Sequence, residues 1–598
     1  MMDSAEIRSR FLKFFEKRGH AILKSAPLVT SDEKGITNST LFNIAGVQPL
    51  IPYLLGQDHP AGKRLASSQK CIRTTDIDDV GDNAHLTFFE MLGNWSLRDY
   101  FKAEAIEWSF TFLTDKVEGL GLDPKRLYVT IFEGNNDAPK DDEALAIWKK
   151  FIPERRVFTK GVESNWWPAI KGPNKDTWTG PTGPCTEMFY DIKGDLGDLT
   201  PEEFKQAEEN QSLIEIWNDV FMQFDKTDGQ ITGRLKEPSV DTGAGLERIT
   251  VAINNKKSVY EIDSFSEILE FVKKHSKSYT ELSARIIADH LKAATMLAAE
   301  KVVPSNTDRG YVLRRLTRRA VQHADRIGLA GDFIGKIAKI IVQLYQKTYP
   351  KLVLEEIVNI LQDEEARFRK TLKEGMKEFE KTSEKGNISG PEAFKLFSTF
   401  GFPIEITLEL AKERGLKVDF ESYKKELAAH QEISRKGAEQ KFKGGLAGTS
   451  EKEIRYHTLT HLLHQALRDT LGETVQQKGS NINEERVRFD FSYPQKLSDE
   501  QKKNIEEIVN KKIQEALPVN LVILPKKEAE KTGALHFFGE KYGDEVKIYF
   551  IGDNIKSAYS KEFCGGPHVK NTSELGKFKI QKEESVAAGI RRIKGVLI

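Results

Sequence analysis

The sequence is poor in the features that mark secreted and membrane proteins. Its 598 residues include only three cysteines, Cys71, Cys185 and Cys564, too few and too scattered for a disulfide framework. No apolar run approaches the roughly 18 residues that a spanning helix needs. The N-terminal stretch also lacks the apolar segment of a secretion signal. These absences predict a cytoplasmic protein without a membrane partner.

The chain has no net charge, because its 90 basic and 90 acidic residues cancel. No global field therefore attracts nucleic acid, and any RNA contact must come from local patches. The sequence also has neither a P-loop nor a strand-linked GxGxxG, two familiar loops that bind phosphate. Hydrophobic residues at 39% and charged residues at 30% are ordinary for a water-soluble protein, and the length predicts several domains.

The pattern along the chain predicts a multidomain α+β protein. Residues 1–260 mix short apolar strands with Gly/Pro-rich loops, whereas residues 261–440 show long amphipathic helical patterns. A glycine-containing linker is expected at 441–453. Residues 454–598 return to an α+β pattern. No internal repeat or low-complexity tract interrupts this order.

Four potential metal ligands are split between two short motifs near the C-terminus. HTLTH contains His457 and His461, and CGGPH contains Cys564 and His568. Imidazole and thiolate are ligand types that zinc prefers, and four of them complete a tetrahedral shell. An HxxxH pair alone is more often two solvated helix residues, but the CxxxH half favours one Zn²⁺ per chain. His464 shares the helical face and either supports a ligand or is solvated.

A second group of motifs lies in the first 260 residues. DTGAGLER places Gly243 and Gly245 just before a helix, where a ligand can approach the backbone closely, although a plain strand-to-helix turn would also explain it. Upstream, KCIR ends a strand-like run at Arg73, and TFFEM begins another that contains Phe89. Two antiparallel strands of this kind could present an arginine to a phosphate and an aromatic ring to a base.

Together these segments resemble the alanyl-tRNA synthetases, a family of class II aminoacyl-tRNA synthetases. The resemblance spans nearly the whole chain in a specific order. The matching segments are AEIRSRFLKFFEKRGH, KCIR, TFFEMLGNWS, NWW, GPCTEMFYD, IEIWNDVFMQF, DTGAGLERI, PSNTDRGYVLRR, HTLTHLLHQAL, QKGS, EFCGGPHVKNTSELG and AAGIRRI. The family implies an antiparallel-sheet catalytic domain (1–260), a helical domain that binds the tRNA acceptor stem (261–440) and a zinc-binding editing domain (454–598).

The resemblance assigns roles in amino-acid activation. Arg73, Asp241 and Arg248 would be the catalytic residues. The ATP set, with Mg²⁺ accompanying the nucleotide, is Arg73, His85, Phe89, Gly245 and Arg248.

The same resemblance assigns a pocket for L-alanine. Asp241 would hold the ammonium group, and the walls would fit a single methyl group. The alanine set is Trp167, Asn218, Val220, Asp241 and Gly243.

The resemblance also implies editing and tRNA recognition. The four C-terminal ligands would hold zinc in a site that hydrolyses mischarged Ser-tRNA(Ala) and Gly-tRNA(Ala), with Gln477 recognising the wrong amino acid. Such editing is expected physically, because one methylene distinguishes substrates by only about 1–3 kcal/mol. The G:U-marked acceptor stem would be contacted by Asn306, Arg309, Arg314 and Arg318. On the predicted helix, Arg314/Arg318 and Arg315/Arg319 are paired at i, i+4 and form a basic stripe, for which an arginine-rich solvated helix face is the alternative.

This sequence departs from the family pattern at several places. The loop after Arg73 reads only TTDIDD and is short, and Ser398 stands where an aspartate commonly helps to read the G:U pair. The linker replaces a small β-barrel, and the sequence ends after AAGIRRIKGVLI, before the family's C-terminal module. We therefore expect a monomer with weakened affinity for tRNA.

Two other classes of protein share part of these motifs. A free-standing editing hydrolase would keep the His/Cys set but would not need Arg73, Asp241 or Arg248. A catalytically dead RNA-binding relative would be expected to lack a motif arginine or a metal ligand. Since all of these residues are present, the sequence favours a ligase that also edits.

Overall fold

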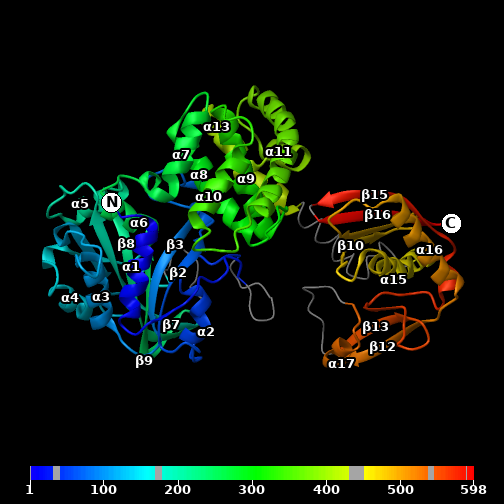
Figure 1. Ribbon diagram of the computed structural model, residues 1–598, viewed down its shortest axis with the longest axis horizontal. Helices are drawn as coiled ribbons and strands as arrows, with labels where there is room; N and C mark the ends of the chain where they lie inside the picture. The colour runs from blue at the N-terminus through cyan, green and yellow to red at the C-terminus, as the bar shows by residue number, and fades with distance from the viewer. Residues whose placement is uncertain (1, 31–40, 169–177, 430–449, 536–544, 588) are drawn as a thin grey trace. The chain divides into compact units, whose positions relative to one another are not determined.

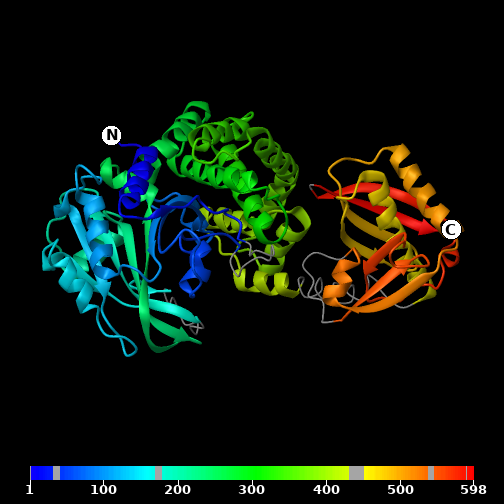
Figure 2. The same cartoon turned by 60° about the horizontal axis from the view of Figure 1, so that its bottom comes forward.

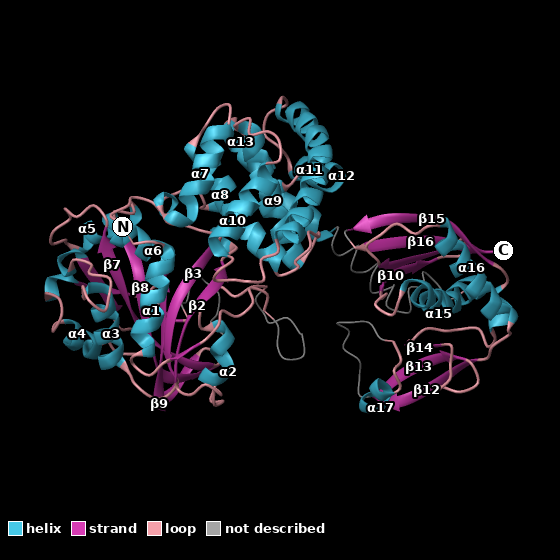
Figure 3. Ribbon diagram, viewed as in Figure 1, coloured by secondary structure: helices cyan, strands magenta, loops and turns pink. Residues whose placement is uncertain are grey.

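The computed structural model describes the chain except for residues 1, 31–40, 169–177, 430–449, 536–544 and 588. The chain divides into two compact units, Met1–Lys370 and Thr371–Ile598, which are described separately. Each unit contains helices and strands (Figures 1 and 3), which confirms the multidomain α+β class. None of the described helices is long and apolar enough to cross a membrane.

A largely antiparallel sheet forms the centre of the first unit. In spatial order its main path is β1 (Ala21–Ile22), β2 (Arg64–Ile72), β3 (Phe88–Ser96), β9 (Gln230–Gly245), β8 (Leu213–Thr227), β7 (Gly180–Asp191), β4 (Leu127–Phe132) and β5 (Val157–Lys160). Strand β6 (Trp166–Trp167) pairs with β7. Only the β1–β2 and β4–β5 pairs among these are parallel. Every residue of β7 is buried, so this strand lies deep in the core.

Aromatic side chains pack the N-terminal helix against this sheet. Phe11 of α1 (Ser4–Glu16) has its ring centroid 5.4 Å from that of Phe112 on α3 (Lys102–Thr114) and 5.8 Å from that of Trp217 on β8. All three rings are buried, so α1 and α3 share one apolar core with the sheet. The other helices of this region are α2 (Ile51–Leu54), α4 (Asp142–Trp148), α5 (Pro201–Glu209) and α6 (Leu246–Ile253).

Helices replace strands in the rest of the first unit. They are α7 (Asp263–His275), α8 (Glu281–Ala299), α9 (Asp308–Arg326), α10 (Phe333–Tyr345) and the first part of α11 (Leu354–Ser383). Figure 2 shows them gathered in a bundle of their own. Helix α8 packs against both α9 and strand β3, so the bundle contacts the central sheet directly.

The second unit continues α11 and contains α12 (Gly390–Phe400) and α13 (Ile404–Glu413) before its α+β part. That part has a four-stranded and a three-stranded sheet. The first is β10 (Gln477–Ile482), β11 (Val487–Ser492), β16 (Ile590–Leu597) and β15 (Phe578–Ala587), and the second is β12 (Val519–Pro525), β13 (Glu545–Ile551) and β14 (Ser560–Phe563). The helices are α15 (Glu451–Leu471), α16 (Asp499–Gln514) and α17 (Lys526–Lys531).

Helix α15 begins at a capping box, because Ser450 and Glu453 each bond to the backbone N–H of the other. The buried side chains of Leu459, Leu463, Phe489 and Phe491 then join α15 to the four-stranded sheet.

The compact units divide the chain differently from the predicted ranges. Their boundary, after Lys370, lies inside α11, whereas the sequence pattern predicts boundaries near 260 and 440. The change from strands to helices does follow β9 and α6. Most of the predicted linker, 441–449, lies outside the described residues. The predicted domain ranges therefore stay predictions.

Candidate active site and metal centre

One concavity of the first unit brings together residues from both the ATP set and the alanine set. Its lining includes Arg73, His85, Phe89, Gly243, Gly245 and Arg248. These residues come from the end of β2, the following loop, β3, the end of β9 and the first turn of α6. The fold thus brings together residues that lie far apart in sequence, since Arg73 and Arg248 line the same concavity.

Two arginines are already anchored at the edge of this concavity. The Cζ atom of Arg73 lies 5.0 Å from the ring centroid of Phe89, and its Nε donates to the Ile44 carbonyl. Arg248 forms an ion pair with Glu215, with 3.2 Å between Nη1 and Oε2. Two cationic groups beside an aromatic face suit a planar base with attached phosphates. Nothing in the local sequence pattern around Glu215 indicates that it pairs with Arg248, so this residue could not be predicted from the sequence.

The alanine set lies on neighbouring strands at matching register positions. Asn218 and Val220 of β8 pair with Gly243 and Asp241 of β9, so all four lie on the same face of the sheet. Trp167 packs against the apolar cluster that contains Val220. Gly243 also lines the concavity that contains the predicted ATP set, named the nucleotide concavity after that prediction, so the two predicted subsites share this residue.

Two hydrogen-bond acceptors on this face, from Asp241 and Asn218, could bind a small cation. The Asp241 carboxylate accepts a hydrogen bond from Trp95 Nε1 at 2.7 Å. Burial raises the pKa of Asp241 to about 7, although the bond from Trp95 opposes this shift. The Asn218 Oδ1 atom is buried and has no hydrogen-bond partner within the described part of the chain. An ammonium group bound here would satisfy two acceptors.

The predicted tRNA-binding arginines are less exposed than the sequence pattern suggests. Arg314 and Arg318 of α9 both form ion pairs with Glu364 of α11, at 3.2 and 2.7 Å, and Glu364 is only 1% exposed. Arg314 also donates to Asn306 Oδ1, just before α9. Arg309 donates to the backbone carbonyls of residues 30 and 41. Ser398 lies in α12, within the second unit.

The two neighbouring arginines of α9 point toward the loop between β2 and β3. Arg315 pairs with Asp78 at 2.7 Å, and Arg319 donates to the Ile77 carbonyl at 2.8 Å. The stripe expected from the i, i+4 spacing is therefore divided between two protein partners. Contact of this helix with RNA phosphates stays a prediction.

The four predicted metal ligands converge in the second unit. Their ligand atoms all lie within 4.8 Å of one another. His457 and His461 lie one turn apart on α15, while Cys564 and His568 follow β14. The Cys564 Sγ atom lies 3.4 Å from both His457 Nε2 and His568 Nε2. This is the donor set and the approach expected of one tetrahedral zinc ion.

Each imidazole of the cluster is oriented through its other nitrogen. The Nδ1 atoms contact the Pro567 carbonyl for His457 (3.0 Å), Glu562 for His461 (2.8 Å) and Thr458 Oγ1 for His568 (3.2 Å). His461 Nε2 is buried and has no hydrogen-bond partner among the described residues. An orphaned nitrogen that faces a thiolate fits a metal ligand, since a buried polar atom otherwise needs a partner.

His464 and Glu562 lie beside the four predicted ligands. His464, which the sequence left as either supporting or solvated, is buried and shares Glu562 with His461 at 2.8 Å. Burial alone would raise the pKa of Cys564, but hydrogen bonds from the imidazoles hold it well below its usual range, which favours the thiolate.

Gln477 is the first residue of β10 in the four-stranded sheet. This position does not test its predicted role in recognising the wrong amino acid.

Glycine is required beside the ligands for space. A Cβ atom at Gly566 would lie 2.3 Å from His457 Cε1, whereas one at Gly565 would meet nothing within 4 Å. Neither residue has a positive φ. The need for glycine at Gly566 is thus steric, because the chain there approaches the ring of a predicted ligand.

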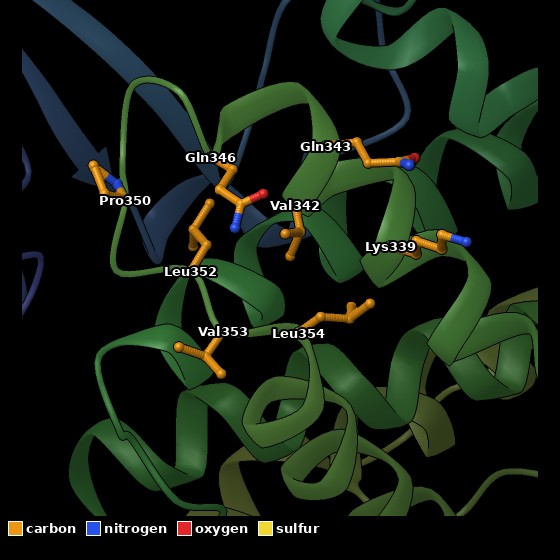
Figure 4. Close-up of a pocket in the computed structure, with 8 residues that line it drawn as sticks. All are labelled: Lys339, Val342, Gln343, Gln346, Pro350, Leu352, Val353 and Leu354. Carbon is orange, nitrogen blue, oxygen red and sulfur yellow. The ribbon is translucent and has the colours of Figure 1, made fainter.

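Another concavity of the first unit contains none of the predicted site residues. It lies between the end of α10 and the start of α11 (Figure 4). Its lining is Lys339, Val342, Gln343, Gln346, Pro350, Leu352, Val353 and Leu354.

Comparison with known proteins agrees with this geometry. Residues 6–487 match the family "tRNA synthetases class II (A)", and residues 546–594 match the "Threonyl and Alanyl tRNA synthetase second additional domain". Alanine–tRNA ligases of Treponema pallidum and Treponema denticola are 44% and 46% identical, over 99% of this chain and 98% of their own. The alanine–tRNA ligase of Thermotoga sp. (strain RQ2) is 36% identical over 100% of this chain and 80% of its own. The chain therefore belongs to the alanine–tRNA ligase family of class II aminoacyl-tRNA synthetases.

Proposed function

We propose that the first unit activates L-alanine with ATP and then transfers it to the 3′-terminal adenosine of an alanine tRNA. The observation that carries this proposal is the continuity of the nucleotide concavity with the face around Asp241. Gly243 belongs to both, so a carboxylate held by the second could reach a phosphate held by the first. Family membership supports the same reaction.

Activation needs positioning and charge neutralisation more than covalent help from the protein. A carboxylate oxygen of alanine attacks the α-phosphorus, a P–O bond forms, and pyrophosphate leaves with the electrons of the broken bond. Arg73 would neutralise the charge on the α-phosphate oxygens. Phe89 and Arg248 would stack on opposite faces of adenine, with Gly245 leaving room and His85 near the outer phosphates. Mg²⁺ bound to ATP would add positive charge.

The alanine subsite follows from size and charge. Asp241 and the orphaned Asn218 Oδ1 would accept hydrogen bonds from the ammonium group. Trp167 and Val220 would leave space for one methyl group. In the transfer step a hydroxyl oxygen of the terminal adenosine attacks the carbonyl of alanyl-adenylate, and AMP leaves.

A second activity is proposed for the metal centre. A methyl-sized pocket cannot exclude glycine and rejects serine weakly, because one small group is worth only about 1–3 kcal/mol. His457, His461, Cys564 and His568 would hold one Zn²⁺, which when bound supplies positive charge near the ester carbonyl. Water would hydrolyse Ser-tRNA(Ala) and Gly-tRNA(Ala) at this site, and Gln477 would contact the wrong amino acid.

The helical part of the first unit is proposed to receive the acceptor stem. Arg314 donates to the side-chain oxygen Oδ1 of Asn306, so the side-chain nitrogen Nδ2 is the group left to donate to the minor groove of the G:U pair. Arg309, Arg314 and Arg318 would then contact phosphates, provided that the Glu364 pairs rearrange.

Alanine-dependent ATP–pyrophosphate exchange tests the first activity, followed by charging of wild-type and G:U-to-G:C alanine tRNA. Exchange with alanine, together with loss of charging on the G:C variant, is the expected result. Absence of exchange with intact deacylation of Ser-tRNA would instead leave an editing protein on a synthetase scaffold.

A further inference from the structure

A single carboxylate organises the loop that carries His85. Asp82 lies between β2 and β3, and its Oδ2 accepts hydrogen bonds from His85 Nδ1 at 2.6 Å and from Gln211 Nε2 at 2.7 Å. Its Oδ1 accepts from the backbone N–H groups of Ala84 at 2.9 Å and His85 at 2.8 Å. Four donors thus converge on one side chain that is not part of the predicted ATP set.

Two other elements hold this loop in place. Arg285 of α8 donates to the carbonyls of Gly81 and Asp82, both at 2.9 Å. Gln211, just after α5, also accepts from the Asn83 N–H at 3.1 Å and adopts a φ of 58°, uncommon for a residue other than glycine. The geometry of Asp82 and His85 is therefore built by distant parts of the unit.

His85 lines the nucleotide concavity, and its Nδ1 is held by the hydrogen bond to Asp82. A carboxylate can only accept, so His85 Nδ1 carries a proton and Nε2 is the nitrogen left for a ligand. The bond to Asp82 raises the pKa of His85 above its ordinary value, although burial and nearby Arg248 oppose this and Asp76 adds to it. The other charged groups that line the concavity are Arg73, Glu215 and Glu247.

The pKa of Asp82 is lowered, whereas that of His85 is raised. Burial would raise it, but the hydrogen bonds from His85, the backbone and Gln211 hold it well below the usual range. The carboxylate is thus ionised wherever His85 titrates.

We propose that Asp82, held by Gln211, is a positioning residue that keeps His85 oriented and cationic, so that its imidazolium binds the outer phosphates of ATP beside Arg73 and Arg248. This inference rests on the proposed function, since it concerns the same ATP site. It adds that nucleotide affinity depends on pH through a carboxylate that does not itself touch the nucleotide.

The first experiment measures the KM for ATP in alanine-dependent exchange between pH 6 and 9, at saturating alanine. In the wild type the KM is expected to rise as pH passes upward through the raised pKa of His85. In Asp82→Asn the rise moves to lower pH, and the KM at pH 7.5 increases about tenfold, as expected for one lost charge-assisted bond. In His85→Gln the KM is high throughout and this rise disappears.

Matched variants separate positioning from general disruption. Asp79→Asn removes an exposed carboxylate of the same loop and is expected to leave the profile unchanged. The titration of ATP is common to every variant and cancels from their comparison. An Asp82→Asn profile that coincides with the wild type would overturn the proposal, as would an unaltered KM in His85→Gln.

A second measurement does not depend on catalysis. NMR titration of the histidine rings, with His85 assigned by its loss in His85→Gln, is expected to give a His85 pKa above 6.5 that falls in Asp82→Asn and rises on addition of ATP. An unchanged pKa in either comparison would contradict the proposal even if exchange activity were absent. Failure of exchange alone would count against the proposed function.

Discussion

The two candidate sites are assembled by different means. The nucleotide concavity draws its side chains from five elements of the first unit, whereas the four metal ligands come from one helix and one turn of the second. In the first, sheet register and burial set both position and charge, as at Asp241. In the second, hydrogen bonds to Nδ1 atoms set the direction of each ring. The first should therefore be sensitive to pH, and the second to substitutions around its ligands.

The largest expected effect is the loss of one activity, amino-acid activation or deacylation, while the other is retained. Arg73→Gln should lower kcat/KM for ATP–pyrophosphate exchange about 100- to 1,000-fold, because a positive charge facing the α-phosphate is lost. Deacylation of Ser-tRNA(Ala) should stay within about twofold of the wild type. Cys564→Ala serves as the reciprocal control, retaining exchange while losing deacylation. Parallel losses of both activities in either variant would show that the sites do not work independently.

An intermediate effect is expected at Glu562, which touches two histidines but ligates nothing. Glu562→Gln replaces a carboxylate that accepts from both rings, so His461 loses part of its orientation. Zinc affinity, measured by competition with a chromophoric chelator, should fall about 10- to 100-fold. Glu545→Gln, at an exposed position on neighbouring β13, is the matched control. Equal affinities in the two variants would reduce Glu562 to a packing role.

The smallest effect concerns the pH dependence of alanine binding. The pKa of Asp241 is raised to about 7, so its carboxylate is increasingly protonated as pH falls below that value. A neutral carboxyl attracts an ammonium group weakly, and the KM for alanine should rise toward about tenfold per pH unit on the acid side. The exchange assays use saturating ATP, so the pH dependence of ATP binding through His85 does not alter the measured KM for alanine. A KM for alanine that is constant between pH 6 and 8 would contradict the assignment.

Much of both sites could be predicted from short motifs. The spacing of His457 and His461 on one helix face, and of Cys564 and His568 across a turn, was enough to predict that these four ligand atoms converge. The strand–loop–strand pattern around Arg73 and Phe89 likewise led to the concavity. In these cases the type of residue and its spacing in the sequence were enough to predict which side chains lie together.

The supporting residues could not be found in the same way. Glu562, Glu364 and Glu215 acquire their roles from partners 98, 46 and 33 positions away, and an isolated glutamate has no local signature. The arginines of α9 show the reverse problem, since their spacing indicated an exposed stripe. In the folded protein these arginines bind carboxylates and carbonyls of other segments, and the sequence pattern of the helix does not indicate those partners.

The close approach of the chain at Gly566 has a consequence for mutational scanning. A methyl group there would collide with His457 Cε1, while the same change at Gly565 meets open space. In a library scored for survival under misincorporation by serine, Gly566 should group with the four ligands although it has no side chain. Its neighbour should tolerate many substitutions. The boundary of the proposed editing site would then be drawn between two adjacent glycines that look alike in the sequence.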